Sequence, residues 1–433
     1  MPTFARGVHP KGNKEPSRRC AIEIMPAPDE VMIPLSQHVG ALATPVVQTG
    51  DRVLRGQLVA SSDRFVSANV FSSVTGEVVG FEGKRTPTGA LVPHIRIRND
   101  RGLEEASFPE LSDPAPEEIL ERVRAAGITG MGGASFPLHV KLSPPEGKKI
   151  DTLILNGAEC EPYLTCDERI MIERAREVAD GALLVGRALG VERVFVGMED
   201  NKPEALSAML ETEPARAGKL SVVSLKTKYP QGAEKQLIFA LTRRKVPDGG
   251  LPMDVGCVVT NVQTAFATSE ACRKGKPLYE RVLTVSGGAV ANPKNVLVAT
   301  GTSFREVVDF CGGMKESPAK ILSGGPMMGF ALADLEPSVA KGTSGILLLQ
   351  SREINLAPVR ACINCGRCRD ACPMNLMPMY IDNYAIAGDL DAAARYGAMS
   401  CIECGSCAFS CPSKRPLVQS IRLAKKKIRE KKV

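Results

Sequence analysis

The pattern of hydrophobic and polar positions predicts a parallel α/β core in the middle of the chain. Residues 116–126 have the spacing of an amphipathic helix, and residues 151–155 form the apolar run of a buried strand. A helix over about 167–189, a strand over 193–196 and a helix over 203–210 follow. Because strands and helices alternate, we expect parallel βαβ units with helices packed on the sheet.

Shorter runs on either side of this core predict two β-rich modules. Residues 46–57 and 73–79 alternate strand-like runs with glycine turns, and they resemble a barrel-sandwich domain of the biotinyl/lipoyl type. Such domains carry their prosthetic group on a hairpin lysine. Because residues 15–83 contain no lysine, we expect a scaffold or docking role. Residues 278–313 combine strand signals, glycine turns and a short helix, and they resemble a small β-grasp domain that acts as a rigid spacer.

Length and composition indicate a multidomain globular protein. The chain has 433 residues, of which 44% are hydrophobic and 24% are charged. It has no apolar stretch of about 18 residues and no signal-peptide core, so we expect a cytoplasmic chain. The net charge of +7 is concentrated in residues 421–433, a basic tail that either lies in solvent or touches an acidic partner. With no tryptophan and no zinc-finger or RNA-binding signature, no nucleic-acid partner is expected.

Eight of the 14 cysteines fall into two runs that predict iron–sulfur clusters. Each run has the spacing C-x2-C-x2-C-x3-C-P, as in bacterial two-cluster ferredoxins. Three cysteines of a run bind one cluster, and the fourth binds the cluster of the other run. We therefore assign one [4Fe–4S] cluster to Cys362, Cys365, Cys368 and Cys411, and a second to Cys372, Cys401, Cys404 and Cys407. Zinc sites pair separated C-x2-C knuckles and fit these runs poorly.

A glycine-rich loop precedes the predicted strand at 151–155, and an acidic loop follows it. The glycine loop, Gly-Met-Gly-Gly-Ala-Ser-Phe-Pro at 130–137, exposes backbone N–H groups to a phosphate whose charge Lys141 can balance, or it is simply a tight turn. The acidic loop, Asn-Gly-Ala-Glu-Cys-Glu-Pro at 156–162, follows the strand at the edge where α/β sheets bind ligands. Its glutamates can accept hydrogen bonds from ribose or flavin, or they can be helix N-terminal charges without a ligand.

These segments resemble the flavin motifs of known electron-transfer proteins. The glycine loop is similar to G-R-G-G-A-G-F-P-x-G-x-K-W of the NADH-oxidising flavoprotein subunit of respiratory complex I, and the acidic loop is similar to its N-A-D-E-x-E-P. Residues 260–264, Thr-Asn-Val-Gln-Thr, are similar to its N-N-V-E-T. Over nearly the whole chain, the order of modules resembles still more closely the RnfC family, the C subunits of Rnf-type ion-translocating ferredoxin:NAD oxidoreductase complexes. That family opens with the motif seen here at 7–10, Gly-Val-His-Pro, and closes with two cysteine runs.

The resemblance implies a set of flavin and dinucleotide contacts. FMN would be held by Gly130, Gly132, Gly133, Lys141, Asn156 and Asn261. Glu159 and Glu161 would lie near the flavin or the nicotinamide, and Phe136 against the adenine of NADH. Four residues depart from the complex I pattern and affect the dinucleotide pose more than flavin binding: Met131, Ser135, His139 and Leu142. Because the flavin performs the chemistry, no side chain is assigned as a catalytic acid or base.

The predicted fold is multidomain α/β plus β. The expected segments are a barrel-sandwich domain without an attachment lysine (1–105), an FMN/NADH-binding α/β domain (106–272), a β-grasp domain (273–330), a linker (331–355), a helical ferredoxin-like domain with two [4Fe–4S] clusters (356–420) and a basic tail (421–433).

The predicted function is electron transfer between NAD(H), FMN and two [4Fe–4S] clusters within a membrane-bound ferredoxin:NAD oxidoreductase that pumps ions. The expected partners are the other subunits of such a complex, with a ferredoxin-like subunit among the candidates. The expected location is peripheral, on the cytoplasmic face of the cell membrane. Two alternatives stay open: a soluble flavin/iron–sulfur cobalamin reductase of a microcompartment, which resembles this family throughout, and a non-catalytic two-cluster relay.

Overall fold

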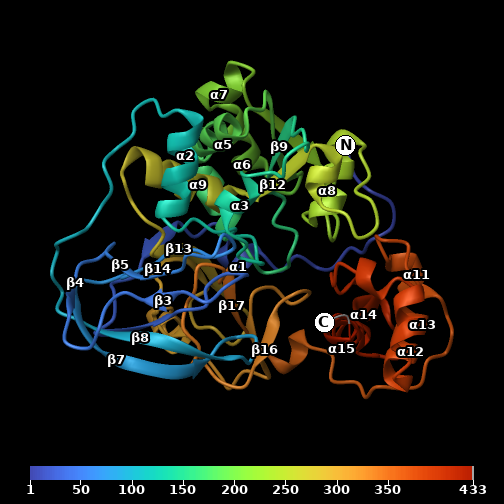
Figure 1. Ribbon diagram of the computed structural model, residues 1–433. Coiled ribbons are helices and arrows are strands. Elements are labelled where there is room, and N and C mark those ends of the chain that lie inside the picture. The colour runs from blue at the N-terminus through green and yellow to red at the C-terminus, as the bar shows by residue number, and fades with distance from the viewer. Residues whose placement is uncertain (432–433) are drawn as a thin grey trace.

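The computed structural model describes residues 1–431 and shows an α/β domain, two β-rich modules and a helical cysteine domain (Figure 1). The α/β domain lies above the β-rich modules in Figure 1, and the cysteine domain, in orange to red, lies beside the β-rich modules and below α8. Within the described residues, no helix is long and apolar enough to cross a bilayer.

The α/β domain is built on a parallel four-stranded sheet in the order β11-β10-β9-β12, so the predicted βαβ core is confirmed. The strands are β9 (Thr152–Gly157), β10 (Arg193–Glu199), β11 (Ser221–Leu225) and β12 (Cys257–Asn261). The helices are α2 (Pro116–Ala125), α3 (Leu138–Lys141), α4 (Cys166–Glu173), α5 (Ala175–Leu189), α6 (Pro203–Leu210), α7 (Glu213–Arg216), α8 (Glu234–Thr242) and α9 (Val262–Arg273).

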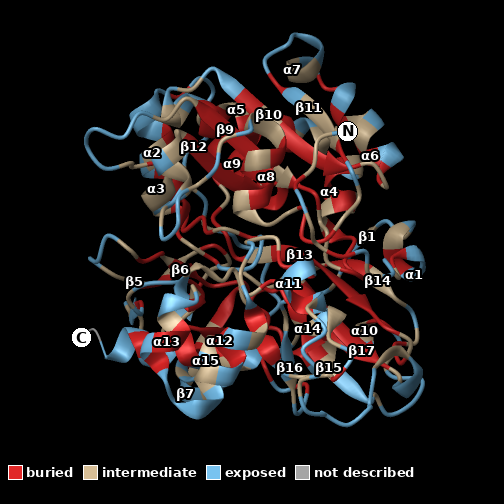
Figure 2. Cartoon of the chain, turned by 90° about the vertical axis from the view of Figure 1, so that its right-hand side faces the viewer, coloured by how far each residue is buried: buried red, intermediate tan, exposed pale blue. Residues whose placement is uncertain are grey.

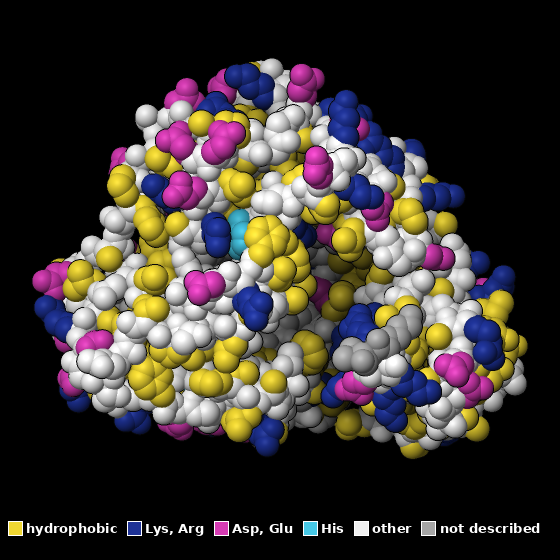
Figure 3. Space-filling model, in the orientation of Figure 1, with side chains coloured by type: hydrophobic (Ala, Val, Ile, Leu, Met, Phe, Trp, Pro, Cys, Tyr) yellow, Lys and Arg dark blue, Asp and Glu magenta, His cyan; other side chains and the backbone are white. Residues whose placement is uncertain are grey.

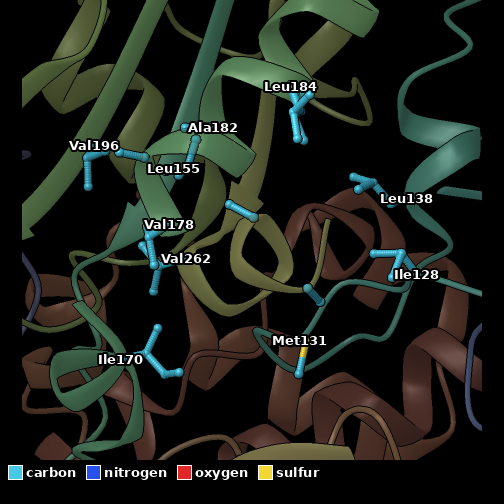
Figure 4. Packing of buried hydrophobic residues seen from close by; sticks show 14 of the residues in the cluster. Ile128, Met131, Leu138, Leu155, Ile170, Val178, Ala182, Leu184, Val196 and Val262 are labelled. Atoms are coloured by element: carbon cyan, nitrogen blue, oxygen red, sulfur yellow. The ribbon is translucent and has the colours of Figure 1, made fainter. Parts of the chain in front are cut away.

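Apolar side chains from the sheet and its helices form the main core. Leu155 of β9 and Val196 of β10 lie with Val178 and Ala182 of α5 and Val262 of α9 in one buried cluster (Figure 4). Buried residues run through the sheet and along nearly all of α9 (Figure 2). Such burial of apolar surface is the main source of stability, and it fixes the sheet edge that carries the candidate site.

The helix predicted over residues 167–189 is in fact two helices. α4 ends where Arg174 leaves the helical conformation with φ −131° and ψ 34°, and α5 begins at the next residue. The Arg174 side chain forms ion pairs with Glu177 and Glu270 at the bend. The apolar spacing continues through the bend and neither glycine nor proline marks it, so periodicity alone cannot reveal it.

Two small sheets that share one apolar core form the N-terminal β module. One sheet contains β2 (Glu30–Pro34), β8 (Leu91–Asn99), β7 (Gly76–Arg85) and β4 (Arg52–Val53) in that order, and the other contains β3 (Thr44–Pro45), β5 (Leu58–Ser61) and β6 (Val70–Phe71).

The first 24 residues of the predicted domain 1–105 lie outside these two sheets and contact other modules. Val8 forms a β-bridge with Tyr229, α1 (Glu15–Arg18) packs beside β14, and β1 (Ile22–Ile24) pairs with β14. The reason is burial, because Phe4 and Val8 fill apolar sites against the α/β and cysteine domains. This part of the chain therefore connects several modules.

A six-stranded mixed sheet forms the second β module, in the order β1-β14-β13-β17-β15-β16. Its further elements are β13 (Glu280–Ser286), β14 (Lys294–Ala299), α10 (Phe304–Phe310), β15 (Lys320–Ser323), β16 (Phe330–Leu332) and β17 (Gly345–Leu349). The predicted linker 331–355 is therefore wrong. β17 is wholly buried between β13 and β15, and its apolar run is typical of an interior strand.

Short helices form the cysteine domain: α11 (Arg367–Ala371), α12 (Pro378–Ala387), α13 (Leu390–Arg395), α14 (Ser406–Ser410) and α15 (Leu417–Glu430). The predicted basic tail is mostly part of α15, which corrects the boundary at 421. Ile421, Ala424 and Ile428 lie in the domain core, while Lys426 and Lys427 are exposed. Residues 432–433 of the predicted tail lie outside the described residues.

Close packing between α5 and α9 provides a test of this core. A Cβ atom on Gly181 would lie 1.8 Å from the carbonyl oxygen of Ala265, so neither backbone can accommodate it. We expect Gly181→Ala to lower stability by about 1–3 kcal/mol, as overpacking does, measured as a lower urea midpoint by circular dichroism.

The matched control is Gly186→Ala on the same helix, where the nearest atom is a Val194 methyl group at 3.0 Å. That side chain can move, and alanine favours helix by about 1 kcal/mol over glycine. Equal urea midpoints for the two variants would contradict the described α5–α9 contact.

Candidate cofactor sites

Two asparagines lie side by side at the carboxyl end of the parallel sheet. Asn156 of β9 and Asn261 of β12 are register partners. Asn261 caps α9 by accepting a hydrogen bond from Gln263 N at 2.8 Å, and its Nδ2 donates to Asp167 at 2.7 Å. Asn156 Nδ2 donates to the carbonyl oxygen of Gly232 at 2.8 Å. The structure thus brings together the two asparagines that the sequence predicted as flavin ligands.

The glycine loop, residues 130–137, packs against this edge. A Cβ atom on Gly132 would meet Asn261 Cβ at 3.2 Å, and Met131 N donates to Thr264 Oγ1 at 2.9 Å. Gly130 N donates to the carbonyl oxygen of Phe136 at 2.8 Å, which closes the loop. Residues 132–134 are exposed, and no N–H group of residues 132–136 donates to an acceptor in the described chain. A run of free backbone donors fits a phosphate group.

Lys141 and Phe136 both lie near this sheet edge, in or directly after the glycine loop. Lys141 Nζ donates to the carbonyl oxygen of Val259 at 2.9 Å and to Glu234 at 3.2 Å. The lysine therefore lies beside the middle of β12 and forms hydrogen bonds within the protein. Phe136 is half-buried in the glycine loop.

In the structure the acidic loop extends from residue 156 to residue 164. Both of its glutamate carboxylates point into the protein. Glu159 accepts hydrogen bonds from Asp167 N at 2.7 Å and Glu168 N at 3.3 Å, so it caps α4. Glu161 accepts from Met327 N at 3.0 Å and Met328 N at 2.9 Å. Burial raises the pKa of each carboxyl group to about 7. By capping α4, Glu159 takes the helix N-terminal role that the sequence offered as the alternative to contact with a ligand.

The eight run cysteines line two separate cavities. Cys362, Cys365, Cys368 and Cys411 line one small cavity, and Cys372, Cys401, Cys404 and Cys407 line another. We call these the first and second cysteine cavities. Each cavity therefore gathers three cysteines of one run and the fourth of the other. Four thiols around one mainly apolar space fit the ligand set of an iron–sulfur cluster.

The two runs share one backbone conformation. Positive φ angles occur at Asn364 and Glu403, 52° and 58°, and at Gly366 and Gly405, 76° and 81°. The first pair lies two residues after the first cysteine of its run, and the second pair directly follows the second cysteine. The repeated turns explain why the two cavities are alike.

The second cysteine cavity lies against the α/β domain. Tyr229 donates its hydroxyl hydrogen to the carbonyl oxygen of Cys404 at 2.6 Å, and Cys160 of the acidic loop packs in the same apolar cluster. Gln236 Nε2 donates to the carbonyl oxygen of Pro373 at 3.2 Å. The first cavity is more open, because Cys365 is exposed there. Figure 3 shows the surface hollowed between the α/β, β-rich and cysteine parts.

Several residues around the site were not predicted from the sequence. Lys14, Lys202 and Tyr229 contact the acidic loop from distant positions, and Thr264 supports the glycine loop. Lys14 and Tyr229 lie outside the recognised motifs, so spacing gives no signal for them. Thr264 lies within the predicted 260–264 segment and could have been included.

Family models match four consecutive parts of the chain. An RnfC barrel sandwich hybrid domain matches residues 2–102, and a Nuo51 FMN-binding domain matches residues 123–270. An SLBB domain matches residues 282–331, and a 4Fe-4S dicluster domain matches residues 361–415. The matches support binding of FMN and of iron–sulfur clusters, in the parts of the chain where the geometry fits these groups.

A solved structure of an NAD+-reducing [NiFe]-hydrogenase in the H2-reduced state shares the fold, with a TM-score of 0.52 and 20% identity. The match covers 72% of this chain and 63% of that chain, which is less than two thirds of its length.

Sequence relatives match over nearly the full length. The C subunit of the proton-translocating ferredoxin:NAD(+) oxidoreductase complex of Clostridium ljungdahlii is 51% identical, over 98% of this chain and 94% of its own. The Na(+)-translocating counterpart of Acetobacterium woodii is 45% identical, over 98% and 97%. The C subunit of the ion-translocating oxidoreductase complex of Rhodobacter capsulatus is 46% identical, over 98% and 83%. The chain therefore belongs to the RnfC family, the C subunits of ion-translocating ferredoxin:NAD(+) oxidoreductase complexes.

Proposed function

We propose that this chain exchanges electrons between NAD(H), FMN and two [4Fe–4S] clusters within a membrane-bound, ion-translocating ferredoxin:NAD oxidoreductase. The observation that carries the proposal is one sheet edge with two features: the glycine loop there has free backbone N–H groups, and the acidic loop there packs against a cavity lined by four thiols. FMN supplies the step between hydride transfer and single-electron transfer. The chain itself binds, orients and shields these groups.

The glycine loop and the two asparagines would hold FMN. The free N–H groups of residues 132–136 suit its phosphate, and Gly130, Gly132 and Gly133 let the backbone approach closely. Asn156 and Asn261 lie at the adjoining strand ends. From the family resemblance we also propose contacts with FMN or NADH for Lys141, Phe136, Glu159 and Glu161. The carboxylates of Glu159 and Glu161 would act indirectly, by fixing the conformation of the acidic loop.

The two cysteine cavities would hold one [4Fe–4S] cluster each, with the crossed ligand sets given above. The second cavity lies against the acidic loop, whereas the first faces outward. We therefore propose that electrons from the flavin edge reach the second cavity before the first.

The remaining subunits would meet this chain near the first cavity. Leu356, Val359 and Ile363 are 73%, 62% and 66% exposed in the segment that leads into and lines that cavity. Exposed apolar side chains grouped in this way mark interaction surfaces. The names of the relatives support a place in a multi-subunit complex, which we propose to be peripheral on the cytoplasmic face of the membrane, with a ferredoxin-like subunit as one candidate neighbour.

An anaerobic titration of the reconstituted chain with NADH tests the function. Flavin bleaching is followed optically and cluster reduction by EPR. We expect NADH to bleach about one FMN equivalent and to give reduced-cluster signals. Clusters that dithionite reduces, in a chain that binds no flavin, would contradict the proposal and leave the two-cluster relay.

The crossed ligand sets are tested with Cys411→Ala. If Cys411 serves the first cavity, we expect the variant to lose about half of the iron while it keeps FMN and the cluster of its own run. The signature is loss of one EPR signal after dithionite reduction.

The matched control is Cys311→Ala, which removes a buried thiol outside both cavities. It should keep both signals. Crossed ligation would be contradicted if Cys411→Ala lost the cluster held by Cys401, Cys404 and Cys407.

A further inference from the structure

Two buried lysines hold the acidic loop from its inner side. Lys14 Nζ donates to the carbonyl oxygens of Glu159 at 2.9 Å, Glu161 at 3.0 Å, and Leu164. Its side chain is only 7% exposed. Lys202 Nζ, which is fully buried, donates to the carbonyl oxygen of Ala158 at 2.7 Å. An ammonium group has three N–H donors, so the three carbonyl acceptors use all those of Lys14.

The inward carbonyls determine where the neighbouring N–H groups point. In a planar trans peptide, the C=O group and the N–H of the next residue point in opposite directions. Because the carbonyls of Ala158 and Glu159 face the lysines, the N–H groups of Glu159 and Cys160 face away from them. Neither N–H donates to an acceptor within residues 1–431.

The local backbone conformation favours binding of an electron-rich group. Glu159 has φ +42°, a value that residues other than glycine rarely adopt. Successive N–H groups around a residue of this conformation can form a small concavity that binds anions or polarised oxygens. Such a strained conformation persists only where surrounding contacts hold it in place. At Glu159 these contacts come from Lys14 and Lys202.

These two N–H groups lie on the sheet edge proposed for FMN. The preceding N–H, that of Ala158, donates to Asn156 Oδ1 at 3.2 Å, and Asn156 is the register partner of Asn261. Asn261 in turn contacts Gly132 of the glycine loop. The polar pyrimidine edge of a flavin ring carries carbonyl oxygens, and these become more electron-rich when the ring is reduced.

We propose that Lys14 and Lys202 are positioning residues of the flavin site, which hold the N–H groups of Glu159 and Cys160 toward the pyrimidine edge of FMN and so favour its reduced form. The carboxyl groups of Glu159 and Glu199 lie 3.9 and 3.5 Å from the ammonium groups of Lys14 and Lys202, so each lysine has an acidic neighbour as well as its carbonyl acceptors. The inference rests on the proposed function, because it requires FMN at this edge.

The test compares the affinities of the full chain for oxidised and reduced FMN under anaerobic conditions. Lys14→Met removes all three donors, so we expect reduced FMN to lose at least about tenfold more affinity than oxidised FMN. That ratio corresponds to a two-electron midpoint potential lowered by about 30 mV. Lys14→Gln, which keeps two donors, should show a smaller shift. Lys11→Met changes an exposed neighbour and should leave both affinities unchanged.

The outcomes separate this inference from the proposed function. A Lys14→Met chain with native circular dichroism and iron content, whose two FMN affinities are unchanged or fall by the same factor, would overturn the inference. If Lys14→Met does not fold, Lys202→Met gives the same comparison, because it removes the donor to the single Ala158 carbonyl. A wild-type chain that binds no FMN would overturn the proposed function instead.

Discussion

Burial of the Lys14 ammonium group is the constraint that links the parts of this molecule. Removing a charged group from water costs free energy unless each of its donors finds an acceptor. Lys14 finds three in the acidic loop, and Tyr163 N of the same loop donates to the carbonyl oxygen of Gly12. A few residues earlier, Gly7 N donates to the carbonyl oxygen of Ala371 in the cysteine domain. One segment therefore ties the flavin edge to the cysteine domain.

This connection explains how a sheet edge and two cysteine cavities can work together. Tyr229 reaches from the α/β domain to Cys404, and Glu161 accepts hydrogen bonds from the chain that leads out of β15. The second cavity is thereby fixed close to the acidic loop, while the first stays open at Cys365. We propose that electrons reach the second cavity first because it is packed against the acidic loop, whereas the first cavity is exposed.

Local sequence patterns predicted much of the fold and of the site. They could not predict contacts between residues that lie far apart in the sequence. The crossed cysteine sets follow from the spacing of each run, and the cavities gather those sets. Asn156 was predicted at a strand end because an apolar run precedes it. Lys14 and Tyr229 could not be predicted, because each acts on residues that lie far away in the sequence. The strand β17 was taken for a linker, because its partners lie elsewhere in the sequence.

The most direct test of the central claim measures the order in which the two cavities receive electrons. Cys407→Ala removes a thiol of the second cavity, and rapid-freeze EPR after mixing with NADH follows the cluster that remains in the first. Dithionite shows that this cluster is intact. We expect NADH to reduce it far more slowly than in the wild-type chain. Reduction at the wild-type rate would contradict a path that passes through the second cavity.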